Sequence, residues 1–168
     1  MSESASVGDN CFPVSVILER RPAKDTTPWA RPQWGVVGVV AGDRLSAGET
    51  AAPVLVHSHD GCDQFLHQGY AVQLHRDSAE SYWYNLVGQS PSLFVVCREN
   101  DAGDPEPFVV TANYDEAGAY MEADGIVYST PVPPEIYQWL ERYVVENFKP
   151  AERKKRKREN WFQESERG

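Results

Sequence analysis

Between residues 14 and 114, several segments alternate hydrophobic and polar positions with the period of a β-strand. In the segment VSVILERR, the spacing of Val14, Val16 and Leu18 places all three side chains on one face of an extended chain. Segments rich in Gly, Pro and Asp, such as the turn signal Asp60-Gly61, separate the alternating runs. This pattern predicts seven strands, over residues 14–21, 34–41, 53–59, 69–77, 81–88, 91–99 and 108–114.

The hydrophobic period changes near the end of the chain. Residues 115–125 predict a short helix, with acidic residues in its first turn and Gly125 as its stop, and residues 126–132 read as extended. Residues 133–148 predict the longest helix, because apolar side chains recur every three or four positions from Ile136 to Phe148. The predicted fold class is therefore α+β and mainly β: an antiparallel meander of about seven strands, rolled into a barrel or two sheets and capped by the C-terminal helix. A barrel of pleckstrin-homology type is one concrete version.

Length and composition favour one globular domain. The chain has 168 residues, of which 41% are hydrophobic and 24% are charged, and these are ordinary values for a folded domain. Residues 1–12 are small and polar, and we expect them to be disordered. We expect the globular domain to span residues 13–150, and residues 151–168 to form a flexible basic tail.

The net charge of −9 is divided unevenly along the chain. Residues 149–168 carry eight Lys or Arg against four Glu, whereas the first 148 residues carry 8 basic and 21 acidic side chains. This balance argues against nucleic-acid or anionic-membrane binding by the body and leaves only the tail for that role. Three separated cysteines, the absence of a signal peptide and the absence of a membrane-length apolar run predict a soluble cytoplasmic protein.

All four histidines lie in the stretch VLVHSHDGCDQFLHQGYAVQLH. A zinc site built from His57, His59, Cys62 and His67 is chemically possible, but their spacing matches no established ligand pattern. A Cys/His nucleophile lacks any surrounding signature. The chain also lacks the phosphate-binding, dinucleotide-binding and nucleophile-elbow motifs. We therefore expect no catalytic residue, no metal and no cofactor, with the histidine and cysteine loop kept as an alternative metal site.

Two segments are candidates for an interaction surface. In the predicted strand that contains SYWYN, Tyr82 and Tyr84 share one face and Trp83 takes the other. One face packs on the core, and the other needs cover from a helix, a loop or a partner. The tail contains the sequence KKRKRENWF, in which a basic block precedes two aromatic residues that would serve as anchors in a docking peptide. The candidate interaction residues of the tail are Lys154, Lys155, Arg156, Lys157, Arg158, Trp161 and Phe162.

Long motifs cover residues 14 to about 162: VSVILERRP, PWARPQWGVVGVV, AESYWYNL, PSLFVVCRE, PFVVTANYDEAGAYMEADG, VPPEIYQWLERYVVENFKP and KKRKRENWF. In these motifs the chain resembles an uncharacterised proteobacterial family, a domain of unknown function. The stretch VHSHDGC is not among these motifs. Genes of that family lie near those for formate dehydrogenase and iron–sulfur proteins, beside a second uncharacterised family. The resemblance thus implies an accessory role in the biogenesis or regulation of a molybdenum or tungsten formate dehydrogenase.

Together these observations predict a non-catalytic accessory or adaptor protein. It would act by binding a protein partner, such as formate dehydrogenase or another accessory protein, through the aromatic segment and the tail. Nucleic-acid binding through the tail is the alternative, and it predicts a steep dependence on salt. A small ligand inside a β-barrel is a further alternative that sequence leaves open.

Overall fold

The computed structural model describes residues 7–42 and 52–148. The described chain forms seven strands, a short 3₁₀ helix and three α-helices. The strands are β1 (Cys11–Arg21), β2 (Gln33–Ala41), β3 (Val54–His59), β4 (Cys62–Gln73), β5 (Ser92–Glu99), β6 (Pro105–Thr111) and β7 (Ile126–Pro131). The helices are η1 (Arg76–Ser78), α1 (Ala79–Val87), α2 (Tyr114–Glu122) and α3 (Pro134–Asn147).

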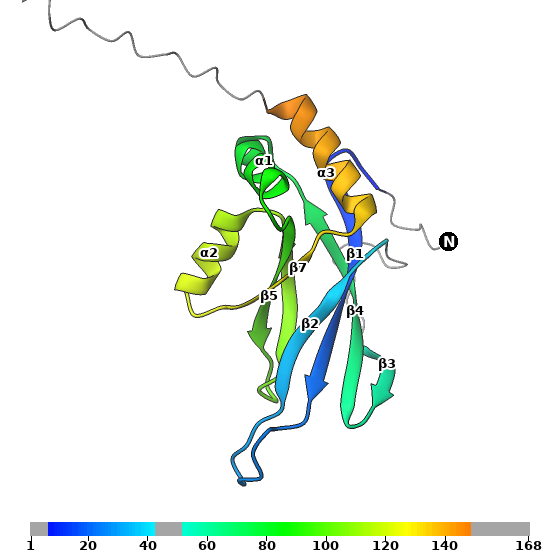
Figure 1. Cartoon of the computed structure of the whole chain (residues 1–168), viewed down its shortest axis with the longest axis vertical. Coiled ribbons are helices and arrows are strands. Elements are labelled where there is room, and N and C mark those ends of the chain that lie inside the picture. Colours follow the sequence, from blue (N-terminus) through cyan, green and yellow to red (C-terminus); the bar gives the residue numbers. More distant parts are fainter. Residues whose placement is uncertain (1–6, 43–51, 149–168) are drawn as a thin grey trace, which may run out of the picture.

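The strands form one mixed sheet in the order β2-β1-β4-β6-β5-β7, and β3 pairs with β4 beside this path. The sheet curls into a nearly closed barrel in which β2 and β7 lie side by side, so the mainly β α+β prediction is confirmed (Figure 1). The sheet is not a simple antiparallel meander, because β4 and β6 pair in parallel at Val72 and Val110. The connection between these two strands contains α1 and the β5 strand, which returns antiparallel to β6.

The barrel interior and the inner faces of α1 and α3 share one hydrophobic core. Alternate positions of β1, including Val14, Val16 and Leu18, have no exposed surface, as the strand period predicted. The helix α3 contributes Ile136 and Leu140 from the apolar stripe expected there, and both are fully buried. In Figure 1, α1 and α3 lie together at one end of the barrel, and α2 lies beside β5 and β7. The C-terminal helix therefore caps the barrel, as expected.

The strand β1 begins before the expected start of the domain at residue 13. The strand β1 begins at Cys11, and Phe12 is a core residue whose ring packs against Trp139 at a centroid distance of 5.2 Å. The indole nitrogen of Trp139 also donates to the carbonyl oxygen of Gly8 at 2.9 Å. The ordered structure thus starts before residue 13, because α3 provides a surface that these residues can cover. Among the described helices, none is long and apolar enough to cross a membrane.

Candidate protein-binding groove

The SYWYN segment forms the helix α1, so the prediction of a strand over residues 81–88 was wrong. Its buried residues are Ala79, Tyr82 and Leu86, which follow the helical spacing of three and four. Helical geometry therefore places Tyr82 and Tyr84 on different faces instead of the same one. Tyr82 is 1% exposed and Tyr84 is 60% exposed.

Of the three aromatic residues, only Tyr84 presents most of its side chain to solvent. Tyr82 belongs to the core, its hydroxyl accepts a hydrogen bond from the backbone N–H of His75 at 3.0 Å, and burial raises its pKa. Tyr82 is therefore removed from the candidate interaction surface. Trp83 is half-buried, and its ring packs against Phe148 at a centroid distance of 5.6 Å, at the end of α3.

A groove of about 440 Å³ lies between α1, the start of α2 and the outer face of β5 and β7. Tyr84 lines one side of it, and Tyr114, which is 69% exposed, lines another. Phe94 also lines the groove, and its ring makes an edge contact with Tyr114 at a centroid distance of 5.8 Å. The remaining lining residues are small and polar, among them Ser81, Ser90, Ser92 and Ser129. The groove therefore offers flat aromatic surfaces beside several hydroxyl groups.

Asn85 fixes the base of the groove. Its side-chain nitrogen donates to the carbonyl oxygens of Ser92 at 2.7 Å and Ala112 at 3.0 Å, and its side-chain oxygen accepts from the N–H of Ser92 at 3.0 Å. One side chain thus holds α1 against the start of β5 and the end of β6. Because these bonds engage backbone groups of two other segments, they set the position of α1.

The start of α2 is held by a second polar cluster. The side chain of Asn113 caps the helix by accepting from the N–H groups of Asp115 and Glu116 at 2.9 and 3.3 Å. The hydroxyl of Ser81 on α1 donates to the carboxylate of Asp115 at 3.1 Å, which connects the two helices directly. Both walls that carry the exposed tyrosines are therefore positioned in advance, which lowers the entropic cost of binding.

The histidine stretch forms the hairpin of β3 and β4. The predicted turn at Asp60 and Gly61 is confirmed, and both residues have positive φ angles, of 51° and 80°. The exposed rings of His57 and His59 lie 6.4 Å apart between centroids, whereas His67 is a buried residue of β4. Burial lowers the pKa of His67. Within residues 7–42 and 52–148, no group of three or more His, Cys, Asp or Glu side chains is arranged to hold a metal ion.

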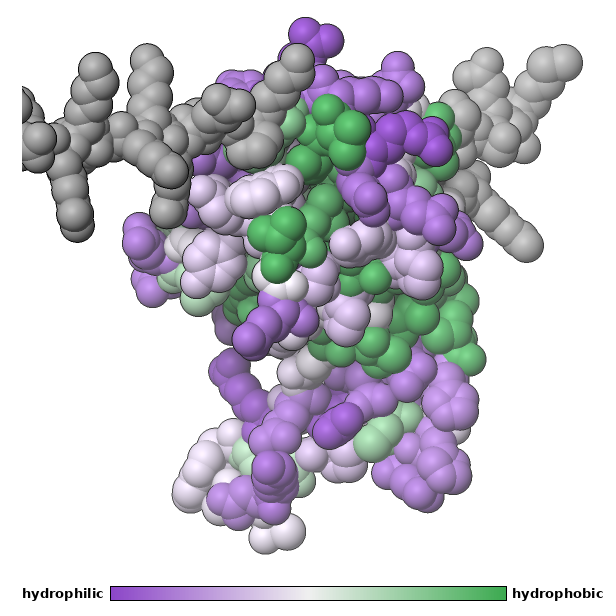
Figure 2. Space-filling model, turned by 45° about the horizontal axis from the view of Figure 1, so that its top comes forward, coloured by the Kyte–Doolittle hydropathy of each residue, from purple (hydrophilic) through white to green (hydrophobic). Residues whose placement is uncertain are grey.

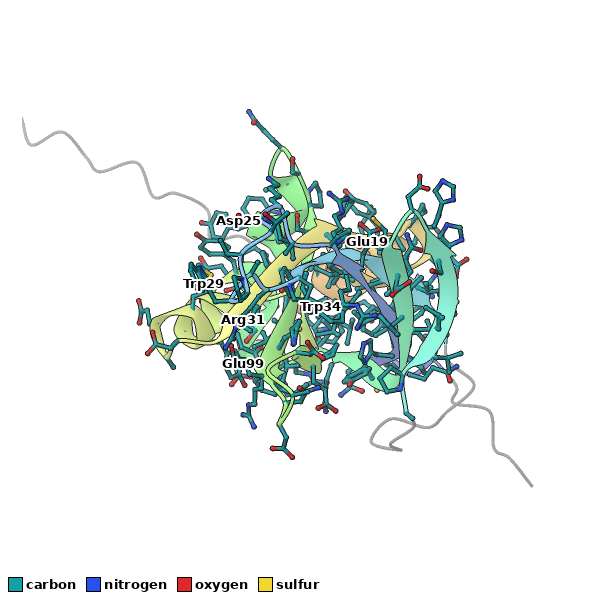
Figure 3. The ribbon with its side chains drawn as sticks, turned by 90° about the horizontal axis from the view of Figure 1, so that it is seen from below. Glu19, Asp25, Trp29, Arg31, Trp34 and Glu99 are labelled. Carbon is teal, nitrogen blue, oxygen red and sulfur yellow. The ribbon has the colours of Figure 1, made fainter. Side chains whose placement is uncertain are left out.

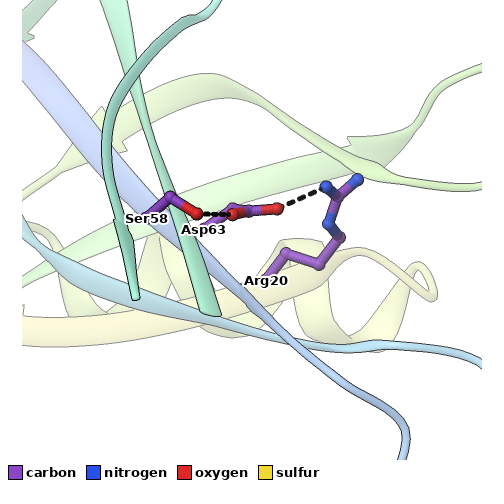
Figure 4. Close-up of polar contacts among 3 residues, drawn as sticks. All are labelled: Arg20, Ser58 and Asp63. Atoms are coloured by element: carbon purple, nitrogen blue, oxygen red, sulfur yellow. Dashed lines mark hydrogen bonds and ion pairs between the residues drawn. The ribbon is translucent and has the colours of Figure 1, made fainter. Parts of the chain in front are cut away.

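A polar cluster that the sequence pattern did not reveal lies at the end of the barrel opposite α1 and α3 (Figure 4). Arg20 forms an ion pair with Asp63 at 2.7 Å, and Ser58 donates to the same carboxylate at 2.6 Å. The guanidinium carbon of Arg20 lies 5.8 Å from the ring centroid of Trp34 and 5.2 Å from that of Phe65. The Ser58 hydrogen bond and the Arg20 ion pair lower the pKa of Asp63. This cluster joins β1, β2, β3 and β4.

The loop between β1 and β2 projects at this same end and carries Asp25, Trp29 and Arg31, as the view from below shows (Figure 3). Trp29 is strongly exposed. The candidate tail residues from Lys154 to Phe162 lie outside the described residues. Among the candidates from sequence, Tyr84 alone is thus placed on the groove, while Asn85, Phe94 and Tyr114 were missed.

The fold is that of a mainly β α+β protein with a nearly closed barrel and a helical cap, and the groove between α1 and α2 lies on its surface. A family model described as "Protein of unknown function (DUF3305)" matches residues 13–157, and the chain belongs to this family. This result confirms the expected membership of an uncharacterised domain family. No curated protein and no solved structure matched the chain.

Proposed function

We propose that this chain is a non-catalytic accessory protein that binds a segment of another protein in the groove between α1 and α2. The observation that carries the proposal is the pair of exposed tyrosines, Tyr84 and Tyr114, on either side of a groove that Asn85 holds in place. Tyrosine is favoured in protein interfaces because it combines a large stiff ring with a polar tip and loses little side-chain entropy on binding.

The chemistry of the groove favours a polypeptide over nucleic acid. Among the described residues, Asp115 is the one charged side chain that lines it, and these residues together carry 18 acidic against 7 basic side chains. A phosphate backbone would be repelled by this balance. Serine hydroxyls provide hydrogen-bonding groups for a peptide, and the tyrosine rings provide apolar contact. The partner that we propose is formate dehydrogenase or another protein needed for its assembly.

Affinity purification from the native cell tests this function. The full chain is used as bait and the enriched proteins are identified by mass spectrometry. We expect a formate dehydrogenase subunit or one of its accessory proteins to be enriched, and then to bind the purified chain directly. A double variant, Tyr84→Ala with Tyr114→Ala, should weaken that binding at least about tenfold, since each interface tyrosine contributes about 1 kcal/mol or more.

The matched control is Val145→Ala on α3, because Val145 is also highly exposed but lies on a different helix. This variant should bind like the unmodified chain. Removal of residues 150–168 separates the contribution of the tail from that of the groove. The proposal fails if neither class of protein is enriched, and the groove is not the binding surface if the double variant binds like Val145→Ala.

A further inference from the structure

The strand β3 exposes three consecutive hydrophobic residues. Val54, Leu55 and Val56 are 48%, 55% and 48% exposed. Successive side chains of a strand point to opposite faces of the sheet, so β3 presents apolar surface on both of its faces. The space-filling view shows hydrophobic side chains gathered along the side of the barrel where β3 lies (Figure 2).

One edge of β3 is also open. The strand pairs with β4 along one edge, and no other strand in the described part of the chain pairs with it. An open edge presents backbone N–H and C=O groups that another strand can bind. Edge strands are usually protected by charged side chains, but residues 52–58 contain no Asp, Glu, Lys or Arg. The strand β3 therefore has both backbone hydrogen-bonding groups along its open edge and exposed apolar side chains.

The strand at the other end of the sheet provides a comparison. Val37 and Val40 of β2 are also almost half exposed. However, β2 lies beside β7 where the barrel nearly closes, and a Cβ atom on Gly38 would lie 4.0 Å from the hydroxyl oxygen of Thr130. The edge of β2 thus lies next to β7, although the two strands are not paired. Exposed valines alone do not make β2 equivalent to β3.

We propose that β3 pairs antiparallel with β3 of a second copy of this chain, so that two sheets join edge to edge. A two-fold axis near Leu55 places the apolar segment of one copy opposite the same segment of the other, as an isologous contact requires. Each copy carries a net charge of −9, and the uncharged stretch 52–58 allows two acidic chains to approach without like charges facing each other. This contact is independent of the groove and of the function proposed for it.

The register of β3 limits the length of this contact. The pairing with β4 shifts between Leu55 and His57, which is a bulge, and Pro53 precedes the strand and has no N–H to donate. The shared ladder is therefore short, and we expect a weak, concentration-dependent dimer. Because the rest of each copy repels the other, added salt should strengthen the dimer by screening that repulsion.

Sedimentation equilibrium of the full chain over a wide concentration range tests the proposal. The weight-average mass should rise from 18.9 kDa toward twice that value. Leu55→Lys should hold the mass at that of the monomer, because two ammonium groups would face each other across the two-fold axis. Val40→Lys on β2 is the matched control and should dimerise like the unmodified chain. Circular dichroism confirms that both variants remain folded.

Three results would each overturn the proposal: a monomeric mass at every concentration, equal loss of dimer in both lysine variants, or a dimer that salt weakens. A dimer that salt weakens would indicate attraction between opposite charges instead of pairing through β3. Contacts between the loop that carries Trp29 and an acidic surface would be an example. Hydrogen exchange gives a second readout if Leu55→Lys does not fold. In the unmodified chain, alternate amides of β3 should exchange more slowly as the concentration rises.

Discussion

Asn85 and Ser92 exchange two hydrogen bonds, at 2.7 and 3.0 Å, and so hold the helix α1 against the strand β5. A third bond, from Asn85 to the carbonyl oxygen of Ala112, extends the same contact to the end of β6. The groove that we propose as the binding site exists because these segments, distant in sequence, are fixed to one another at this point.

Replacement of Asn85 should therefore destabilise the fold. In Asn85→Ala, the N–H and C=O of Ser92 and the C=O of Ala112 lose their side-chain partner, and the expected cost is about 1–3 kcal/mol in the free energy of unfolding. Urea denaturation followed by circular dichroism measures this cost. Gln89→Ala, an exposed substitution in the loop that follows α1, should change stability by less than about 0.5 kcal/mol. Equal effects of the two substitutions would contradict the anchoring role of Asn85.

The two tyrosines of α1 should differ sharply in their effect on stability. Tyr82 is in the core and Tyr84 is exposed, so Tyr82→Ala should cost about 3–5 kcal/mol and Tyr84→Ala less than about 1 kcal/mol. A strand would place both residues on one face and predict similar costs. Thermal or urea unfolding of the two variants thus tests the helical assignment directly, and comparable destabilisation would argue against it.

The buried imidazole of His67 should make stability depend on pH. Burial lowers its pKa below the usual value of 6.5, so the unfolded chain binds a proton more readily than the folded chain as the pH falls. This contribution to stability is present above pH 6.5 and is lost as the pH falls from 6.5 through the lower folded-state pKa. Urea unfolding at pH 7.5 and at about pH 5.5 measures the loss.

The variant His67→Gln should show a smaller difference in stability between those two pH values than the unmodified chain. Gln89→Ala is the control, because it replaces an exposed side chain that has no titratable group, and it should keep the pH dependence of the unmodified chain. The acidic side chains are the same in all of these proteins, so they do not contribute to the difference between them. An unchanged pH dependence in His67→Gln would show that another group is responsible.

Ser58 should control the titration of Asp63. The hydroxyl of Ser58 donates to Asp63 at 2.6 Å, and this hydrogen bond is the largest cause of the lowered pKa of that carboxyl, followed by Arg20. In Ser58→Ala the pKa of Asp63 should therefore rise toward its usual value, as measured by NMR titration of the carboxyl carbon. Arg20→Met should also raise it. A pKa that stays low in both variants would exclude this explanation.

Sequence determined those elements whose signal is local and repetitive. Alternation along β1 and the apolar stripe of α3 identified both elements, and Asp60-Gly61 identified the hairpin turn, because each pattern reflects one buried face or one backbone conformation. The same approach gave a wrong prediction for the SYWYN segment. Consecutive aromatic residues favour a strand, whereas the burial of Tyr82 and Leu86 depends on packing against α3. Residues 126–132 read only as extended, and they contain the strand β7.

Only the tertiary structure decided the order of the strands and the position of the groove. The parallel pairing of β4 with β6 joins residues that no periodic signal connects, and it follows from how the barrel closes around one core. Likewise, the groove brings together three elements through Tyr84, Phe94 and Tyr114. The sequence did not indicate that these three residues lie close together. Periodicity reports which face of an element is buried, whereas a binding surface depends on which elements meet, and this is set by long-range packing.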